Sequence, residues 1–402
     1  MNQEAKTSFL PFIPFLSLIT FASFLNIMAR IIFPPMTPNI CHELNLCHAE
    51  TGNLFFILSV GFAITLFASQ FLSSLISHKM TVIFSLLSTG FALVMTSSAE
   101  TFQFFRLSLF VVGLCSGFFI PSAVAMLCEG VAREHLGKAF GIFATAQSVA
   151  FILSPIIVRS VIEDYSWKEI LNGFGLISSL ISVALYFLFK QGNEKGEPIT
   201  FGFIRNVFSW PSFWILMVLL CIANGLNIGI YNMAPDYFER HNLLEKDAVY
   251  QLIVFARVLS FATAIIAGVV ADRFGLKKSM VLTFVFCGAI TALMGMMEPS
   301  SSLVLFTLQS PVAACLMPLI HYAIATIFPP EKNSTIVSVI APFGFFIGAG
   351  VVPQILGFFG DFNLYAQGFV MFGLTSLLCG AFFSLNRVYK HVEFSQMKSL
   401  ES

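Results

Sequence analysis

The stretch DAVYQLIVFARVLSFATAIIAGVVADRFGLKK, residues 247–278, joins a long apolar segment to a short basic loop. Its apolar part, 247–271, is long enough to cross a bilayer as a helix, because about 20 apolar residues span the hydrocarbon core. A helix also satisfies its own backbone hydrogen bonds where no water is available. The whole 402-residue chain is 57% hydrophobic and only 10% charged, against about 25% charged in a soluble domain. We therefore predict an integral, multi-pass membrane protein.

Twelve apolar segments of this kind follow one another along the chain. They are residues 8–34, 52–74, 80–98, 102–128, 137–160, 169–189, 211–235, 247–271, 279–297, 302–328, 334–358 and 364–386. The first segment is preceded by a single basic residue, Lys6, and no small-residue cleavage site follows it. We therefore expect a retained membrane helix and not a signal peptide. The predicted fold class is all-α, with twelve transmembrane helices.

Lysine and arginine residues lie mainly on one side of these segments. If the N-terminus is cytoplasmic, the connections on its side hold 14 of the 21 Lys and Arg residues, and those on the other side hold four. Because cytoplasmic loops of membrane proteins are enriched in positive charge, we expect both termini in the cytoplasm and a plasma or inner membrane location. The formal net charge of zero gives no indication of a nucleic-acid partner.

The longest connection on the predicted cytoplasmic side divides the chain into two similar halves. Pro121 and Pro155 are 34 residues apart in the first half, and Pro318 and Pro353 are 35 apart in the second. Two repeats in the same orientation place a binding site at the midplane between them. The predicted domains are an N-terminal six-helix bundle at 1–189, a cytoplasmic linker at 190–210 and a C-terminal six-helix bundle at 211–402.

The end of the segment 247–271 and the basic loop after it contain Gly268, Asp272, Arg273, Gly275 and Lys277 in the spacing G-x-x-x-D-R-x-G-x-K. This spacing resembles the signature loop of the major facilitator superfamily. The resemblance implies a transporter with two pseudo-symmetric six-helix bundles, in which this loop closes the cytoplasmic side and does not bind the substrate. We call these five residues the inner-gate motif. The alternative is a solvated turn that carries positive charge.

The corresponding loop of the first half has lost most of this motif. Aligning Lys79 with Lys277 places Ser74 at the position of Asp272 and Ser77 at the position of Gly275. A serine cannot supply the charge of Asp272. We therefore expect a weaker inner gate in this half, with the membrane topology retained.

Two arginines interrupt the apolar segments. Arg257 lies about ten residues, or roughly 15 Å, inside its segment, and Arg30 lies in the first segment. A charge in the bilayer costs on the order of 3 kcal/mol, so both side chains need a bundle interior or a wet cavity. In one interpretation Arg30 and Arg257, one from each half, bind a carboxylate or phosphate through paired donors. In the other, each binds backbone carbonyls and only supports the structure.

Polar residues on helices that can face a central cavity are candidates to complete a substrate-binding site. They are Asn227, Tyr231, Gln147 and Gln309, and with them Asn26, Asn224 and Asn232. The structural alternative for each is a hydrogen bond between helices. His321 is the one deep residue whose side chain normally titrates near neutral pH. It is therefore the candidate proton-coupling residue, and otherwise an interhelical histidine.

A short polar loop carries Cys41 and Cys47 in the sequence CHELNLCH, residues 41–48. Its two Cys-His pairs could bind a metal, its cysteines could form a disulfide on an oxidising face, or both could be thiols. The spacing matches no common zinc site. We expect no bound metal and no cofactor.

These features favour a secondary active transporter that moves a small anionic organic solute, a carboxylate or phosphate ester, by alternating access with proton coupling or exchange. The alternative is an exporter of drugs or neutral metabolites; deep arginines without deep carboxylates disfavour cationic drugs. The sequence contains no Walker loop and no G-x-S-x-G or H-E-x-x-H motif, so we do not expect an enzyme. The expected partners of a monomeric protein are the solute, the lipid bilayer and H+ as a candidate coupling ion.

Overall fold

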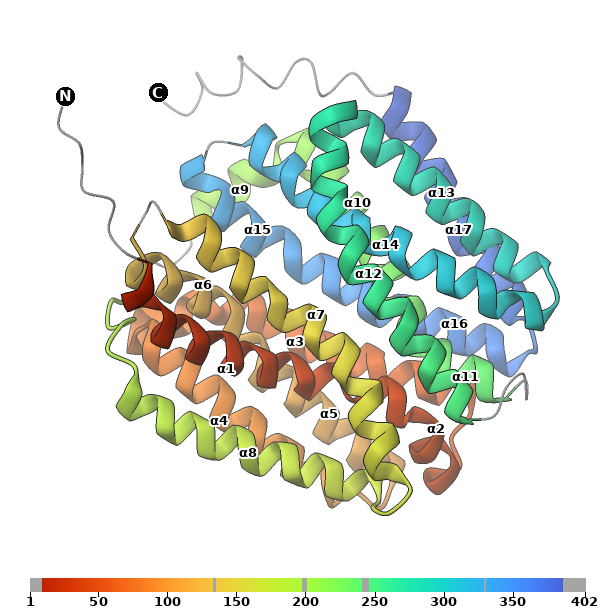
Figure 1. Ribbon diagram of the computed structural model, residues 1–402, viewed down its shortest axis with the longest axis horizontal. Coiled ribbons are helices and arrows are strands. Elements are labelled where there is room, and N and C mark those ends of the chain that lie inside the picture. The colour runs from red at the N-terminus through yellow and green to blue at the C-terminus, as the bar shows by residue number, and fades with distance from the viewer. Residues whose placement is uncertain (1–8, 133–134, 197–200, 241–245, 329, 386–402) are drawn as a thin grey trace.

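The computed structural model describes residues 9–132, 135–196, 201–240, 246–328 and 330–385. Throughout these residues the regular structure is helical (Figure 1). Twelve spans are long and apolar enough to cross a membrane, which confirms the number of predicted segments. The helices of the first half and those of the second form two bundles that lie side by side (Figure 1).

Each half of the chain contributes six of these spans. The first six are formed by η1 (Leu10–Phe12), α1 (Ile13–Ile31), α2 (Phe33–Leu44), α3 (His48–Ile76), α4 (His78–Ser97), α5 (Phe102–Gly117), α6 (Phe119–Gly130), α7 (Leu136–Ile162) and α8 (Trp167–Leu188). A short helix, α9 (Phe201–Phe208), follows the connection between the halves. The last six are formed by α10 (Pro211–Asn224), η3 (Gly225–Gly229), α11 (Ile230–Arg240), α12 (Lys246–Phe274), α13 (Leu276–Met296), α14 (Pro299–Ile327), α15 (Pro330–Gly344), η4 (Phe345–Val351), α16 (Val352–Asp361) and α17 (Tyr365–Leu385).

The two bundles repeat the same helix pairings. In the first half α3 packs along α5 and α4 packs along α8, and in the second half α12 packs along α14 and α13 along α17. These are the second-with-fourth and third-with-sixth spans of each half. Glycine permits the close approach: a Cβ at Gly113 would lie 2.1 Å from the carbonyl oxygen of Leu58, and small residues let membrane helices pack without help from water. The repeated pairing supports the duplication predicted from the proline spacing.

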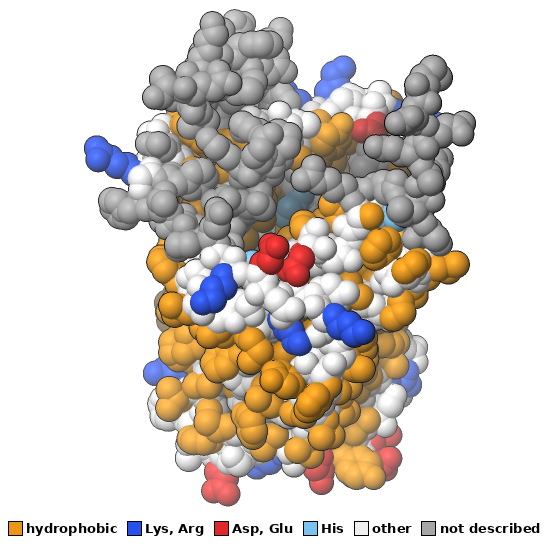
Figure 2. All heavy atoms as spheres, turned by 90° about the vertical axis from the view of Figure 1, so that its left-hand side faces the viewer, with side chains coloured by type: hydrophobic (Ala, Val, Ile, Leu, Met, Phe, Trp, Pro, Cys, Tyr) orange, Lys and Arg blue, Asp and Glu red, His pale blue; other side chains and the backbone are white. Residues whose placement is uncertain are grey.

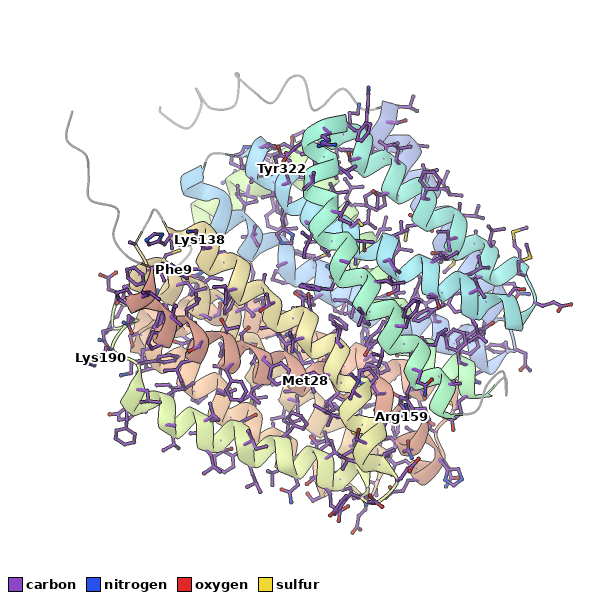
Figure 3. The ribbon with its side chains drawn as sticks, viewed as in Figure 1. Phe9, Met28, Lys138, Arg159, Lys190 and Tyr322 are labelled. Carbon is purple, nitrogen blue, oxygen red and sulfur yellow. The ribbon has the colours of Figure 1, made fainter. Side chains whose placement is uncertain are left out.

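The connection between the halves marks one end of the molecule, which we call the linker end. There the backbone N–H groups of His78 and Lys79 donate to the carbonyls of Glu194 and Gly192 at 3.1 and 2.7 Å. Lys138, Lys190 and Tyr322 lie toward this end, and Arg159 lies at the opposite end, which we call the far end (Figure 3). In Figure 2, Lys and Arg side chains gather in the middle of the view, and hydrophobic side chains cover the flank below them.

The turns after α3 and α12 have the same backbone conformation. Ser77 has φ 94° and Gly275 has φ 86°. Each residue donates its N–H to the carbonyl four residues earlier, Ser73 or Ala271, at 3.1 and 2.9 Å. The alignment that pairs Ser77 with Gly275 is therefore matched by the backbone, although the first half has lost the glycine. Because a side chain is strained at such a φ, Ser77 holds this turn at an energetic cost.

Replacing Ser77 with glycine is expected to stabilise the protein. The relief of backbone strain contributes about 1–3 kcal/mol, and loss of the Ser77 side-chain cap costs a few tenths of a kcal/mol, as estimated for glycine caps. We expect a higher melting temperature for Ser77→Gly in thermal unfolding of the detergent-purified protein. Gly275→Ser is the matched control and should lower it. A Ser77→Gly protein that melts below the wild type would contradict this interpretation.

The first span extends further than the sequence predicts. The predicted apolar segment 8–34 ends at Pro34, which Pro35 follows, but the span runs from Leu10 to Leu44. The helix breaks at Ile32, and both prolines fall in the first turn of α2, where a missing backbone N–H is tolerated. As a result, Arg30 lies near the middle of its 35-residue span and not close to the far end.

Candidate functional site

A cavity of about 480 Å³ lies between the two bundles. Its wall is formed by α1, α3, α6 and α7 of the first half and by α10, η3, α11, α14, α15 and η4 of the second. The wall continues to Gln70 of α3 and Ala325 of α14, which are within two turns of the ends of their helices at the linker end. The cavity therefore extends from mid-depth toward the linker end.

Arg30 lies in the wall of this cavity. Its Cζ atom is 3.9 Å from the ring centroid of Phe62 and 5.7 Å from that of Phe345. Phe62 is at the middle of the 29-residue helix α3, so the guanidinium lies at mid-depth. Its Nε atom is buried without a hydrogen-bond partner, and we find no ion pair between Arg30 and any described residue. The Arg30 guanidinium therefore borders the cavity with aromatic contacts and without a partner for its Nε–H group.

Asn224 is a second unpartnered polar group in the same wall. The residue is 1% exposed, and both its Oδ1 and Nδ2 atoms lack a hydrogen-bond partner among the described residues. A Cβ added at Gly344, the residue before Phe345, would lie 2.9 Å from Asn224 Nδ2. Arg30 and Asn224 therefore approach the same turn around Phe345 from opposite halves of the molecule.

Two π-helical turns, η3 and η4, lie at this depth and pack together. A Cβ at Gly229 of η3 would lie 2.5 Å from the carbonyl oxygen of Gly348 in η4. A π-turn leaves carbonyls outside the regular α-helical pattern, and side chains bind them. Gln309 Nε2 donates to the Leu226 carbonyl at 3.0 Å, and Asn232 Nδ2 donates to the Ala349 carbonyl at 3.3 Å. Gln309 thus lies behind the cavity wall and supports η3.

Arg257 occupies a different environment from Arg30. It is 4% exposed, and its Nη1 and Nη2 atoms donate to the side-chain and main-chain oxygens of Asn227, both at 2.9 Å. Its Cζ atom lies 4.1 Å from the ring centroid of Tyr231 and 4.4 Å from that of Phe151. Phe151 lines the cavity, whereas Arg257, Asn227 and Tyr231 do not. The structure therefore does not bring Arg30 and Arg257 to one open space, and Arg257 binds a carbonyl of η3.

Gln147 and His321 do line the cavity. Both side chains are exposed, Gln147 on α7 and His321 on α14. His321 Nδ1 donates to the Met317 carbonyl at 2.8 Å, because a carbonyl can only accept. Its other ring nitrogen is left as the position at which a proton can bind or leave.

The inner-gate motif lies at the linker end, outside the cavity. Asp272 and Arg273 are exposed, and Asp272 Oδ1 accepts from the Tyr322 hydroxyl at 3.1 Å. Lys277 Nζ donates to the Ser384 carbonyl at 2.9 Å, and Gly275 forms the turn described above. A Cβ at Gly268 would meet no described atom within 4 Å. In this conformation Gly268 is therefore not used for close helix packing.

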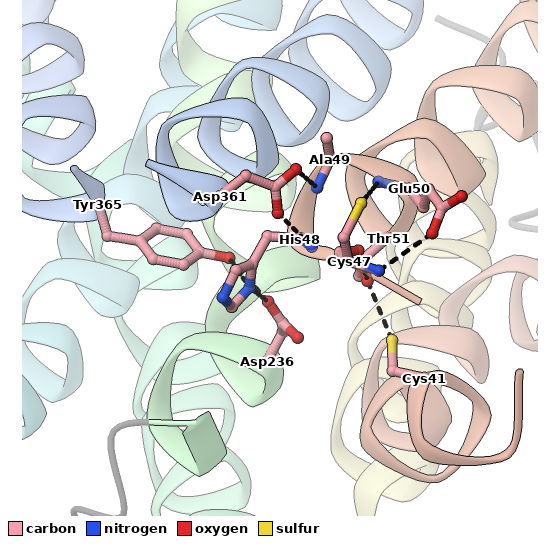
Figure 4. A network of polar contacts seen from close by, with 9 residues as sticks. All are labelled: Cys41, Cys47, His48, Ala49, Glu50, Thr51, Asp236, Asp361 and Tyr365. Carbon is pink, nitrogen blue, oxygen red and sulfur yellow. Dashed lines mark hydrogen bonds and ion pairs between the residues drawn. The ribbon is translucent and has the colours of Figure 1, made fainter. Parts of the chain in front are cut away.

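Hydrogen bonds join the two halves at the far end (Figure 4). His48 Nδ1 of α3 lies 2.6 Å from Asp236 Oδ2 of α11, and the Tyr365 hydroxyl donates to the same oxygen at 2.7 Å. Asp361 of α16 accepts from the backbone N–H groups of His48 and Ala49 at 2.7 and 3.2 Å, where a carboxylate also stabilises the N-terminus of α3. We call His48, Asp236, Asp361 and Tyr365 the far-end latch. It closes the cavity on this side.

Further contacts between the two halves lie at the far end, beside the latch. Asn53 Nδ2 donates to Gln354 Oε1 at 2.8 Å, and the Tyr250 hydroxyl donates to the Pro35 carbonyl at 2.9 Å. A Cβ at Gly52 would lie 2.4 Å from the Pro353 carbonyl oxygen in the other half. The two halves are thus packed together at the far end, while the cavity separates them toward the linker end.

The Cys-His segment contributes to this end without a disulfide between Cys41 and Cys47. Cys41 Sγ lies 2.9 Å from Thr51 Oγ1, and Cys47 Sγ accepts from the Glu50 N–H as the N-cap of α3. Desolvation raises the pKa of the Cys47 thiol, and the charge of Asp361 raises it further. In the part of the chain that the structure describes, no three His, Cys, Asp or Glu side chains are grouped to hold a metal.

Asp236→Asn is expected to open the far end more often. The substitution removes the charge that pairs with His48, and a hydrogen bond to a charged group contributes about 1.5–3 kcal/mol, which corresponds to roughly tenfold or more in the opening equilibrium. The readout is a cysteine at Ser59, which is 4% exposed and lines the cavity. We expect faster labelling of Ser59→Cys by an impermeant thiol reagent added at the far end.

This labelling experiment needs a background in which Cys47, which is exposed, is replaced by serine, another good N-cap residue. Tyr365→Phe removes the hydroxyl that contacts Asp236 and His48 at 2.7 and 3.1 Å but keeps the charge of Asp236, and it should increase labelling less. An Asp236→Asn protein that labels no faster than its parent would show that the latch does not hold the far end closed.

Comparisons with known proteins agree on one family. The model of the Major Facilitator Superfamily matches residues 19–297 and 246–399. The chain is 20% identical to the probable L-galactonate transporter of Escherichia coli (strain K12) over 396 residues, which cover 90% of this chain and 85% of that protein. It is 24% identical to the gentisate transporter of Corynebacterium glutamicum over 375 residues, which cover 87% and 81% of the two chains.

A solved structure shows the same fold. A bacterial homolog of the human lysosomal transporter Spinster, in an inward-facing and unoccupied conformation, matches with a TM-score of 0.75 at 14% identity. The match covers 94% of this chain and 97% of that one. At this identity the likeness establishes the two-bundle fold, and the chemistry of the site has to come from the residues of this chain.

Proposed function

The chain belongs to the major facilitator superfamily, and from this premise we propose that it carries a small organic anion across the membrane by alternating access. It is a transporter and not an enzyme, as the family match and the transporter relatives indicate. The proposed binding site is the cavity between the bundles, with Arg30 as the residue that holds the negative charge.

The observation that carries this proposal is the environment of Arg30. Its guanidinium lies at mid-depth, contacts the ring of Phe62 at 3.9 Å and borders the cavity without an anionic partner. Among the described wall residues there is no Asp, Glu or Lys. A buried cation is unfavourable unless it is paired, and an anion that enters the cavity would supply the missing partner.

The relatives support the same class of solute. Two of them are named for the transport of L-galactonate and gentisate, which are both organic acids. From these two relatives we transfer to this chain only the class of solute, an organic acid. The position of the charge comes from Arg30, and Arg257 is assigned a supporting role because two of its nitrogens already donate to Asn227.

Alternating access supplies the transport step. In the present conformation the far-end latch is closed and the cavity extends to the linker end. We place the linker end in the cytoplasm of a bacterial inner membrane, because the connections on that side carry most of the Lys and Arg residues. In the opposite conformation the latch separates and the two bundles approach at the linker end, where the inner-gate motif, including Gly268, meets the first half.

Proton coupling is assigned to His321, which is exposed in the cavity wall and has one ring nitrogen available. If this assignment holds, His321→Gln should retain solute exchange and lose uptake driven by a pH gradient. The alternative function is export of drugs or neutral metabolites. A neutral solute would leave the charge of Arg30 unpaired. Cationic drugs are disfavoured further because the described wall residues include no Asp or Glu that would bind a positive charge.

A binding screen followed by counterflow tests the proposed function. A ligand that binds the folded protein raises its melting temperature, so we expect carboxylates to stabilise the purified protein more than neutral or cationic compounds do. Labelled hits should then show counterflow in proteoliposomes, which distinguishes a carrier from a receptor. Stabilisation only by neutral or cationic compounds, or binding without exchange, would refute the proposal.

A further inference from the structure

The wall of the cavity contains a cation among mostly apolar side chains, and this composition favours one class of solute. Arg30 is the one Lys or Arg residue among the described residues of the wall. A solute with a single negative charge matches it, whereas a doubly charged phosphate ester would retain an uncompensated charge. The charge count of the wall therefore favours a monocarboxylate within the class of anions proposed above.

The geometry around Arg30 restricts how a carboxylate can approach. The Arg30 Cζ atom lies over the ring of Phe62, 3.9 Å from its centroid, and Phe62 contacts Phe345 edge to face with ring centroids 5.0 Å apart. The N–H donors of a guanidinium lie in its plane and match the two oxygens of a carboxylate. A carboxylate that binds this edge directs the rest of its molecule along the aromatic wall.

Asn224 is the second recognition element. Its amide is buried, both of its polar atoms are unpartnered among the described residues, and it approaches the turn around Phe345 from the other half. Buried polar groups without partners are rare in folded proteins. A carboxylate held by Arg30 can accept a further hydrogen bond from Asn224 Nδ2, which would join both halves through the solute.

Most of the remaining wall is apolar. Four phenylalanines and several aliphatic side chains form it, including Phe55, Phe151, Leu58, Leu66, Leu220 and Ile228. Hydroxyl groups that lose water against such a surface find few partners, and Asn232, one of the polar wall residues, already donates to the Ala349 carbonyl at 3.3 Å. A flat apolar body instead gains by contact with aromatic rings.

We propose that the cavity selects a monocarboxylate with a flat, largely apolar body, benzoate being the simplest example, over a polyhydroxylated acid of the same charge. Its carboxylate is shared by Arg30 and Asn224. This inference rests on the proposed function, since it assigns a solute class to the same cavity.

The test is ligand binding to the purified full-length protein, followed by thermal unfolding and by titration. The probes are benzoate, cyclohexanecarboxylate, gluconate and benzamide, a neutral analogue of benzoate. We expect benzoate to bind at least roughly tenfold more tightly than gluconate. Cyclohexanecarboxylate, which is apolar but not flat, should bind less tightly than benzoate and more tightly than gluconate. Benzamide should bind weakly, because it lacks the charge. Arg30→Met controls for partition of the apolar probes into detergent and should abolish the response to benzoate.

Asn224→Ala tests the second element and should weaken benzoate binding roughly tenfold, as expected for loss of a hydrogen bond to a charged group. If this variant does not fold, Asn224→Asp, which is nearly isosteric and anionic, should weaken binding further. Unchanged benzoate affinity in the variant that folds removes Asn224 from the site.

Gluconate binding that is tighter than benzoate binding and depends on Arg30 would overturn the proposed solute class and leave the organic-anion transporter in place. Binding of benzoate and gluconate that survives in Arg30→Met would overturn both proposals.

Discussion

Replacing Arg30 with methionine is expected to abolish anion uptake while leaving the unliganded protein at least as stable as the wild type. The guanidinium borders the cavity with an unpartnered Nε atom, so its removal breaks no ion pair with a described residue. Methionine matches the apolar part of the arginine side chain and carries no charge. Replacing a buried charged group by an apolar one of similar volume is often neutral or stabilising.

The loss of binding should be large. Two hydrogen bonds from a guanidinium to a carboxylate contribute about 1.5–3 kcal/mol each, so the dissociation constant should rise by a factor of roughly 100 or more. The measurement is titration of the purified variant with the acid that stabilises the wild type most, together with its melting temperature in the absence of ligand.

Arg257→Met is the matched control. This substitution leaves the buried side-chain and main-chain oxygens of Asn227 without the donors that lie 2.9 Å from them, and each unsatisfied buried group costs about 1–3 kcal/mol. We therefore expect lower stability with little change in the affinity of the acid. The reverse outcome, in which Arg257→Met loses binding and Arg30→Met retains it, would move the anion site away from the cavity wall.

Gly52→Trp is expected to stop transport by holding the far end open. A Cβ at this position would lie 2.4 Å from the Pro353 carbonyl oxygen and 2.8 Å from Gln354 Cα, and both are backbone atoms that cannot rotate away. An indole ring therefore fits between α3 and α16 only if the two halves separate at the far end. Its collision affects one of the two alternating conformations and not the folding of either bundle.

The measurement combines uptake with access. We expect uptake at background level, rapid labelling of a cysteine at Ser59 from the far end, and retained binding of the acid from that side. Gly173→Trp is the matched control, since a Cβ at Gly173 meets no described atom within 4 Å, and it should transport normally. Wild-type uptake by Gly52→Trp would show that closure at the far end is not part of the transport cycle.

The number of spans can be predicted because hydrophobicity determines it, and their duplication can be predicted because the proline spacing recurs in the second half. The turn after α12 can also be predicted, since Gly275 supplies the φ of 86°. Its counterpart cannot, because Ser77 adopts a similar φ against its own conformational preference. The depth of Arg30 cannot be predicted either, because the predicted apolar segment ends at residue 34, whereas in the structure a break at Ile32 lets Pro34 and Pro35 begin a new helix.

The candidate site can be predicted only in part. Arg30, Gln147 and His321 stand out in the sequence as deep polar residues, and they line the cavity. Arg257 carries the same signal in the sequence, but its acceptor is a π-turn carbonyl of Asn227, which no local pattern indicates. The far-end latch has no sequence signal, because His48 and Asp236 are 188 residues apart and only the packing of the two halves brings them together.

A structure determined with the bound acid would test the central assignment most directly. The acid to use is the compound that raises the melting temperature most in the screen. We predict its carboxylate in the cavity between the bundles, with an oxygen within about 3 Å of the Arg30 guanidinium, the usual distance for such a pair, and its body along Phe62 and Phe345. An acid bound outside this cavity, or one that leaves Arg30 without contact, would contradict the assignment.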